Sequence, residues 1–202
     1  MIALIDYGAG NLTSVRKGFR AADADLFTPG QPADLSRASG IVVPGVGHFA
    51  ATAALDEGWV AAIRAAGARG VPILGICLGM QWLFEGSAEA PGACGLGMMA
   101  GMCARLPRDE AGVLKVPHVG WNALNAPRPS RLLEGIPPAT QVYFTHSFAA
   151  PLTPETVATC THGTIFAAAV EKAHVFGVQF HPEKSSAAGL RILRNFAALT
   201  RA

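Results

Sequence analysis

A cysteine between two glycines is the most chemically suggestive feature of the sequence. Cys77 lies in residues 75–79, which read Gly-Ile-Cys-Leu-Gly, between an apolar run and a stretch with helical spacing. This pattern is typical of a nucleophile elbow, a tight strand-to-helix turn that exposes a nucleophile above a sheet. Glycines permit the turn, and the N-terminus of the following helix favours a thiolate. We predict that Cys77 is a nucleophile; a small buried cysteine at a strand end is the alternative.

A histidine and a glutamate near the end of the chain could activate that thiol. His181, Pro182 and Glu183 follow residues 175–180, which have the composition of a strand. Pro182 disfavours a helical backbone at His181, and in an extended segment residues two apart project to the same side. We therefore expect Glu183 to orient the imidazole while His181 takes the proton from Cys77. Taken alone, His-Pro-Glu would also suit a turn with a surface carboxylate.

A second glycine-rich turn could stabilise negative charge on a reacting carbonyl. Residues 44–47 read Pro-Gly-Val-Gly and end the apolar run 41–43. In open α/β sheets, ligands bind at the edge where such strands end. We expect the backbone N–H groups of Val46 or Gly47, together with that of Leu78, to form an oxyanion hole. An ordinary tight turn has the same local signature.

These segments need a scaffold, and the first half of the chain alternates apolar runs with helical spacing. Strands are expected at residues 2–5, 41–43 and 71–76, and helices at 12–19, in an alanine-rich region through about residue 66, and at 80–84. Such alternation indicates a parallel sheet covered by helices on both faces.

The second half of the chain has shorter apolar runs separated by turn-rich segments. Strands are expected at residues 113–116, 141–144, 164–170 and 175–180, with turns at 126–130 and 135–138. A closing helix over residues 186–199 has Leu190, Leu193, Phe196 and Ala197 on its apolar face. Because no linker or repeat interrupts the chain, we expect one α/β domain over residues 1–202 with a mostly parallel, mixed sheet.

Composition excludes several other classes of protein. Half of the 202 residues are hydrophobic, 15% are charged, and the net charge is only +2 without a Lys/Arg run, which argues against nucleic-acid binding. The longest apolar stretches fall far short of a membrane span, and the N-terminus has no signal-peptide pattern, so we expect a cytoplasmic protein. Histidine and cysteine spacings do not suggest a metal site. Glycines at positions 8 and 10 lack the third glycine of a dinucleotide fingerprint, and no cofactor is expected.

The chain resembles the class I (triad) glutamine amidotransferases and, among them, the glutaminase subunits of imidazole glycerol phosphate synthase. The elbow and the His-Pro-Glu are shared by the whole class. Further motifs point to the subfamily and span nearly the whole chain: residues 6–12 (Asp-Tyr-Gly-Ala-Gly-Asn-Leu), 95–97 (Gly-Leu-Gly), 117–122 (Pro-His-Val-Gly-Trp-Asn), 143–148 (Tyr-Phe-Thr-His-Ser-Phe) and 177–185 (Gly-Val-Gln-Phe-His-Pro-Glu-Lys-Ser).

The resemblance implies an enzyme that hydrolyses L-glutamine to glutamate and ammonia. A (βα)8-barrel cyclase, bound as a heterodimer, would use the ammonia to make imidazole glycerol phosphate and aminoimidazole carboxamide ribotide on the route to histidine. The implied triad is Cys77, His181 and Glu183. The implied glutamine pocket comprises Gln81, Glu89, His146, Ser147 and Phe148, and the implied docking face comprises Asn11, Trp121, Tyr143 and Lys184.

Two other functions remain open from the sequence. An intracellular cysteine peptidase of related fold would use the same elbow, although it would not explain residues 117–122. A catalytically silent subunit that supports a synthase allosterically would not need the complete triad. Glutamine hydrolysis by the chain with its partner distinguishes the three functions.

Overall fold

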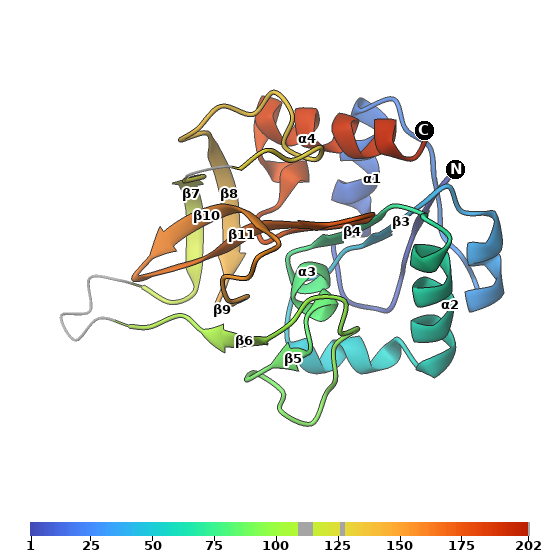
Figure 1. Ribbon diagram of the computed structural model, residues 1–202, viewed down its shortest axis with the longest axis horizontal. Helices are drawn as coiled ribbons and strands as arrows, with labels where there is room; N and C mark the ends of the chain where they lie inside the picture. Colours follow the sequence, from blue (N-terminus) through green and yellow to red (C-terminus); the bar gives the residue numbers. More distant parts are fainter. Residues whose placement is uncertain (109–114, 126–127, 202) are drawn as a thin grey trace.

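A seven-stranded sheet lies at the centre of the computed structural model, which describes residues 1–108, 115–125 and 128–201 (Figure 1). Its strand order is β10–β11–β12–β4–β3–β1–β2. The strands are β1 (Ile2–Leu4), β2 (Leu26–Phe27), β3 (Gly40–Val43), β4 (Ile73–Ile76), β10 (Thr156–His162), β11 (Thr164–Lys172) and β12 (Val175–Val178). All pairings from β12 to β2 are parallel, whereas β10 and β11 pair antiparallel at one edge. The mostly parallel, mixed sheet of the sequence analysis is confirmed.

Alternation of side chains along the central strands divides the core into two layers. On β3, Val42 packs into one hydrophobic cluster, while Ile41 and Val43 pack into the other. On β4, Leu74 and Ile73 are divided in the same way. Since successive strand residues point to opposite faces, a sheet covered on both sides needs apolar residues at every position. These short continuous apolar runs therefore form buried strands.

Helices cover both faces of the sheet (Figure 1). The helices α1 (Leu12–Ala21) and α4 (Ser186–Leu199) pack on one face, and α2 (Glu57–Ala68) and α3 (Leu78–Leu83) on the other. Two 3-10 turns, η1 (Pro32–Arg37) and η2 (Phe49–Ala54), join the second face, and η3 (Pro182–Lys184) precedes α4. Asn11 and Asp56 cap α1 and α2, each accepting a hydrogen bond from a backbone N–H of the first turn. None of the helices in the described ranges is long and apolar enough to cross a membrane.

Two small sheets lie beside the main one. The first consists of β5 (Gly86–Ser87), β6 (Met102–Arg105) and β9 (Phe148–Ala149), and the second is an antiparallel pair of β7 (His118–Ala123) and β8 (Gln141–His146). Of these strands, β8 is predicted from the sequence and β5, β6, β7 and β9 are not; in the main sheet, β2 and β10 are not predicted either. Of the strand expected at residues 113–116, residues 113 and 114 lie outside the described residues, and Val116 precedes β7 without being part of a strand. The turn expected at 126–130 also begins outside them.

Candidate active site

Cys77 occupies a strained turn between β4 and α3. Its backbone has a φ of 53° and a ψ of −106°, a conformation that costs a non-glycine residue about 1–3 kcal/mol. The flanking glycines are required by close packing: a Cβ at Gly75 would lie 2.6 Å from the carbonyl oxygen of Gly79, and one at Gly79 would overlap the carbonyl of Val43. The Cys77 N–H donates to the carbonyl of Val178 at 2.8 Å. The turn thus has the geometry of a nucleophile elbow next to the end of β12.

His181 and Glu183 follow β12 and form a buried pair. His181 Nδ1 lies 2.8 Å from Glu183 Oε1, and each side chain is only 2% exposed. Because a carboxylate accepts, Nδ1 carries a proton, and Nε2 is the nitrogen left to interact with Cys77. The prediction that the backbone is extended through Glu183 is wrong, because Glu183 lies in the 3-10 turn η3. His181 itself is extended, and the 3-10 turn brings the carboxylate back to the ring.

The surroundings of His181 favour its protonated form. Burial lowers the pKa of the imidazole, but the proximity of Cys77 and the hydrogen bond and charge interaction with Glu183 outweigh it and raise the pKa to about 9. A nearby negative charge stabilises an imidazolium, and hydrogen bonds to the charged form act in the same direction. A proton donor is therefore present beside the sulfur at neutral pH.

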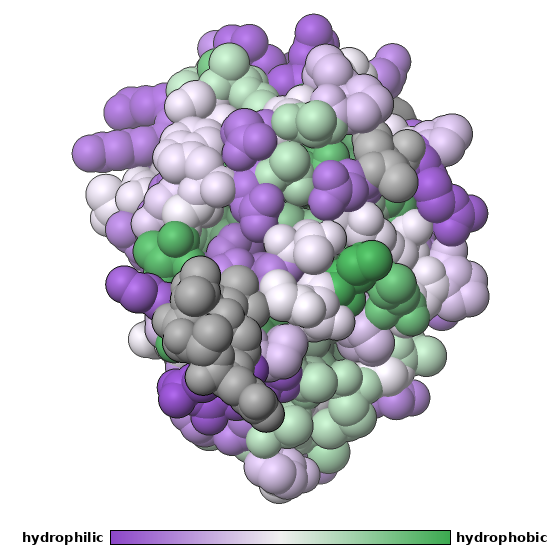
Figure 2. All heavy atoms as spheres, turned by 90° about the vertical axis from the view of Figure 1, so that its left-hand side faces the viewer, coloured by the Kyte–Doolittle hydropathy of each residue, from purple (hydrophilic) through white to green (hydrophobic). Residues whose placement is uncertain are grey.

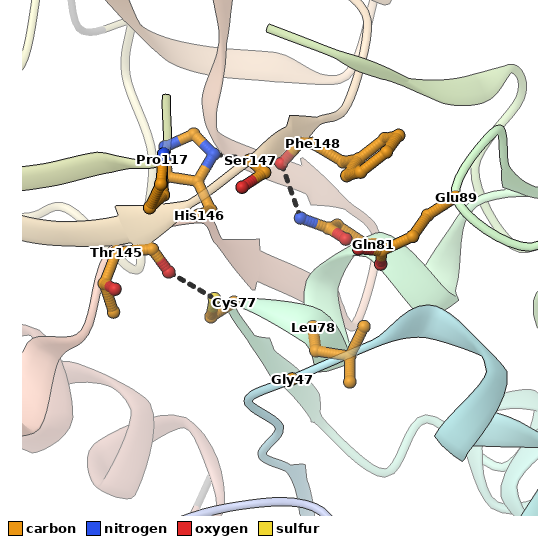
Figure 3. Close-up of a pocket in the computed structure, with 10 residues that line it drawn as sticks. All are labelled: Gly47, Cys77, Leu78, Gln81, Glu89, Pro117, Thr145, His146, Ser147 and Phe148. Atoms are coloured by element: carbon orange, nitrogen blue, oxygen red, sulfur yellow. Dashed lines mark hydrogen bonds between the residues drawn. The ribbon is translucent and has the colours of Figure 1, made fainter. Parts of the chain in front are cut away.

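A pocket of about 200 Å³ opens in front of Cys77 (Figure 3). It is lined by Gly47, Cys77, Leu78, Gln81, Glu89, Pro117, Thr145, His146, Ser147 and Phe148. All five residues expected to hold the substrate are among these. Pro117 and Thr145 were not expected, and Val46 does not line the pocket.

Polar contacts fix the side chains of this pocket. Gln81 Nε2 donates to the carbonyl of Phe148 at 2.7 Å, and the Phe49 N–H donates to Glu89 Oε2 at 2.8 Å. Both ring nitrogens of His146 are engaged within the protein, one with the Phe148 carbonyl at 2.9 Å and the other with His118 at 3.0 Å. The imidazole of His146 therefore has no free nitrogen for a substrate in this arrangement.

The expected oxyanion donors are not all directed at the pocket. The Leu78 N–H donates to the carbonyl oxygen of Gly45 at 3.3 Å. The Tyr7 hydroxyl donates to the carbonyl of Pro44 at 2.8 Å and joins the start of this loop to the segment that follows β1. Gly47 has a φ of 102°, in the region that favours glycine. In this state a loop carbonyl faces the N–H that an oxyanion would use.

One buried polar residue at the site was missed by sequence reasoning. Gln179 is fully buried, and its Nε2 lies 3.5 Å from the sulfur of Cys77. The available signal was its position two residues before His181, which in an extended segment puts both side chains on the same side. No cluster of three or more potential metal ligands occurs in the part of the chain that the structure describes.

Comparison with known proteins agrees with this geometry. The sequence model of the family "Glutamine amidotransferase class-I" matches residues 3–199. The chain belongs to this family. The amidotransferase is also 48% identical to "Imidazole glycerol phosphate synthase subunit HisH" of Moorella thermoacetica, over 99% of its own length and 95% of the relative's. It is 43% identical to the protein of the same name from Methanothermobacter thermautotrophicus, over the full length of both.

Solved structures agree with the fold of the amidotransferase. "Crystal structure of glutamine amidotransferase" matches with a TM-score of 0.76 at 16% identity, covering all of both chains. "Structure of PurLQS from Thermotoga maritima" matches with a TM-score of 0.75 at 18% identity, covering 96% of each chain. At these identities the likeness concerns the fold alone.

Three of the four residues expected to dock a partner lie together on the surface of the amidotransferase. Trp121 is 51% exposed, its ring centroid lies 6.1 Å from that of Tyr143, and Lys184 Nζ lies 5.8 Å from the centroid of the Tyr143 ring. Asn11 is also exposed and caps α1. The β7–β8 pair lies at the left of Figure 1, and the view onto that side shows hydrophobic side chains scattered among polar ones (Figure 2). Partner binding by these residues stays a prediction.

Proposed function

We propose that this amidotransferase is the glutaminase subunit of an imidazole glycerol phosphate synthase. It hydrolyses L-glutamine and passes the ammonia to a (βα)8-barrel cyclase, with which it forms a heterodimer in histidine biosynthesis. The observation that carries the proposal is the Cys77 elbow at a small polar pocket, with the buried His181–Glu183 pair close enough to interact with its sulfur. Its four cysteines are all free, which suits a reducing compartment, and we place the protein in the cytoplasm.

The chemistry begins with the thiolate of Cys77. It attacks the side-chain amide carbon of glutamine, and backbone N–H groups of the loop at residues 44–47 and of Leu78 stabilise the oxyanion. His181 then gives the proton on Nε2 to the departing nitrogen, and the carbon–nitrogen bond breaks to release ammonia and leave a thioester. His181 next removes a proton from water, which hydrolyses the thioester to glutamate and returns the thiolate. These steps require neither a metal nor an organic cofactor.

Recognition of the amino-acid end of glutamine falls to the opposite wall of the pocket. The carboxylate of Glu89 suits the α-ammonium group, and Gln81 and the backbone of residues 146–148 offer further polar contacts. One oxygen of Glu89 already accepts a hydrogen bond from the N–H of Phe49. This bond fixes the carboxylate relative to the loop that precedes Phe49 and contains residues 44–47. A pocket of about 200 Å³ suits a single amino acid.

The oxyanion loop offers a means of switching the reaction. With the Leu78 N–H donating to the Gly45 carbonyl, the oxyanion hole is incomplete. A change in the orientation of the loop peptides would free that donor and add a second one from Val46 or Gly47. Each oxyanion donor is worth a factor of roughly 10²–10³ in rate. A partner can shift this equilibrium only by binding one loop conformation more tightly than the other.

The test is glutamate formation by three preparations: the chain alone, its complex with the cyclase, and the complex with a cyclase ligand bound. We expect a rate that rises by a factor of at least roughly 10² from the first to the third. Cys77→Ala should abolish glutamate formation yet leave cyclisation from added ammonia, and Cys94→Ala, at an exposed cysteine away from the pocket, should have no effect. If none of the three preparations forms glutamate, the proposed glutaminase activity is wrong. Equal rates in all three would contradict only the proposed activation by the partner.

A further inference from the structure

The nucleophile has a buried hydrogen-bond donor beneath it that the catalytic triad does not include. Gln179 is 0% exposed, its Nε2 lies 3.5 Å from Cys77 Sγ, and its Oε1 lies 3.0 Å from Gln81 Nε2. We propose that Gln179 is a further catalytic residue, whose amide N–H stabilises the thiolate of Cys77. The inference deepens the proposed function, on which it rests, by assigning a group that the known triad chemistry does not require.

The orientation of the Gln179 amide follows from its neighbours. The carbonyl of Phe148 can only accept, so the Gln81 atom 2.7 Å from it is the nitrogen. That same nitrogen lies 3.0 Å from the Gln179 side chain, which must therefore present its oxygen there. The other amide atom of Gln179, the nitrogen, is thus directed at Cys77 Sγ. A flipped amide would place two donors against each other at Gln81 and an acceptor against the sulfur.

Two neutral histidines hold the acceptor on which this orientation depends. The Phe148 carbonyl also accepts from His146 Nδ1 at 2.9 Å, so His146 Nε2 is the acceptor for His118 Nδ1 at 3.0 Å. His118 Nε2 in turn accepts from Asn122 Nδ2, which also donates to the carbonyl of Thr161. The backbone carbonyls of Phe148 and Thr161, at the two ends, thus fix the direction of every hydrogen bond in this series. His118 and His146 are positioning residues for Phe148.

Burial keeps both histidines neutral. It lowers the pKa of His146 to about 3 and that of His118 to about 4. The nearby imidazole of His162 lowers both pKa values further, whereas the hydrogen bond to the Phe148 carbonyl raises that of His146. A charged imidazole would have a proton on each nitrogen, and His146 could then not accept from His118. The direction of these hydrogen bonds is therefore retained at pH values above about 4.

The two polar contacts of the sulfur favour opposite protonation states. The Cys77 thiol can donate to the carbonyl of Thr145, 3.8 Å away, but a thiolate there would gain nothing from it. Gln179 can only donate at its nitrogen, so its contact strengthens when the sulfur is negative. Of the other titratable groups facing Cys77, His181 favours the thiolate through its positive charge, and Tyr7 is neutral because burial raises its pKa. Removing the Gln179 donor should shift the balance toward the thiol.

The test is the rate of Cys77 alkylation by iodoacetamide as a function of pH, in the full chain, read by mass spectrometry of the labelled peptide. Gln179→Met keeps the length of the side chain and removes the donor. Gln179→Glu keeps an acceptor for Gln81 but presents a carboxylate oxygen to the sulfur. We expect the midpoint of the alkylation profile to rise by about half to one pH unit in the first variant, a three- to tenfold slower reaction below the midpoint, and by more in the second. His118→Asn, which interrupts the series of hydrogen bonds further from the sulfur, should raise the midpoint by less.

Gln141→Met, at an exposed position on β8, is the matched control and should leave the profile unchanged. An unshifted midpoint in Gln179→Met, with a uniformly lower rate or a lower melting temperature, would overturn the inference and reduce Gln179 to a packing role. If Gln179→Glu does not fold, Gln179→Met alone decides the question. Alkylation does not involve glutamine, so this result is separate from the glutaminase assay, whose failure would instead overturn the proposed function.

Discussion

His181 is held between two opposing effects, and their balance determines when it can act as an acid. Burial disfavours its charged form, while Cys77 and Glu183 favour it strongly enough to raise the pKa to about 9. Since a raised pKa means that folding favours the protonated form, this contribution to stability is fully present below pH 6.5. It is lost as the pH rises through about 9. In the proposed mechanism, the same protonation supplies the proton that the departing ammonia needs.

Replacement of Glu183 by Gln should therefore change both the rate and its pH dependence. In the wild type we expect glutamine hydrolysis to decline above about pH 9, as His181 loses its proton. Glu183→Gln removes the negative charge that helps to raise this pKa and leaves only a neutral acceptor, so the decline should begin at lower pH, and turnover should fall by a factor of at least about 10². The measurement is kcat/KM for glutamine from pH 6 to 10 in the complex. A profile that keeps the wild-type midpoint would show that Glu183 does not set the state of His181.

The β4–α3 elbow depends on glycines that leave no room for a side chain. Gly79→Ala would drive a Cβ into the carbonyl of Val43, so the turn must shift. We expect a loss of about 1–3 kcal/mol in the free energy of unfolding, together with a large loss of turnover. Gly92→Ala is the matched control, because a Cβ there meets no atom within 4 Å. Both variants are checked by denaturant unfolding and by the rate of glutamate formation. A Gly79→Ala variant with wild-type stability and turnover would contradict the packing described for this turn.

Elements with a continuous apolar run or a clear helical period could be predicted from the sequence, and strands without either pattern could not. β3 and β4 are continuous apolar runs, and α4 has the bounds that its periodicity predicts. β7 reads His-Val-Gly-Trp-Asn-Ala, without clear alternation, because it pairs only with β8 and exposes Val119 and Trp121. The pairing of β7 with β8 is a long-range contact that no local pattern encodes.

The same distinction applies to the site. Cys77, His181 and Glu183 carry local signatures, a glycine-flanked elbow and a proline-anchored pair, so sequence could bring them forward as candidates. For Gln179 the only local signal is its position two residues before His181, because its contact with Gln81, which is 98 positions away in the chain, depends on the fold. The bond between the Leu78 N–H and the Gly45 carbonyl likewise depends on how two loops meet in space.

The molecule as a whole places its pocket and its exposed aromatic cluster at the same end of the sheet. β8 contains both Tyr143, in the surface cluster with Trp121 and Lys184, and His146, in the pocket wall. The His181 N–H also donates to the carbonyl of Tyr143 at 2.8 Å. A protein bound to this cluster would therefore contact β8, the strand that also forms part of the pocket wall.

Trp121→Ala tests whether that cluster binds the cyclase. Exposed tryptophans are often hot spots, and we expect the Kd of the complex to rise by a factor of about 30, corresponding to about 2 kcal/mol. The free energy of unfolding of the isolated chain should change little, because the side chain is half exposed. Leu152→Ala, at a similarly exposed apolar residue outside the cluster, is the control. Calorimetric titration of both variants with the cyclase decides it, and equal affinities would place the interface elsewhere.

The most direct test of the account is whether glutamine becomes covalently attached to Cys77 during turnover. The complex with cyclase ligand bound is mixed with glutamine, quenched in acid within the first turnovers, and analysed by peptide mass spectrometry. We expect a glutamyl group as a thioester on the peptide that contains Cys77 and none on peptides with Cys94, Cys103 or Cys160. Glutamate formation without any adduct on Cys77, or an adduct on another cysteine, would contradict it.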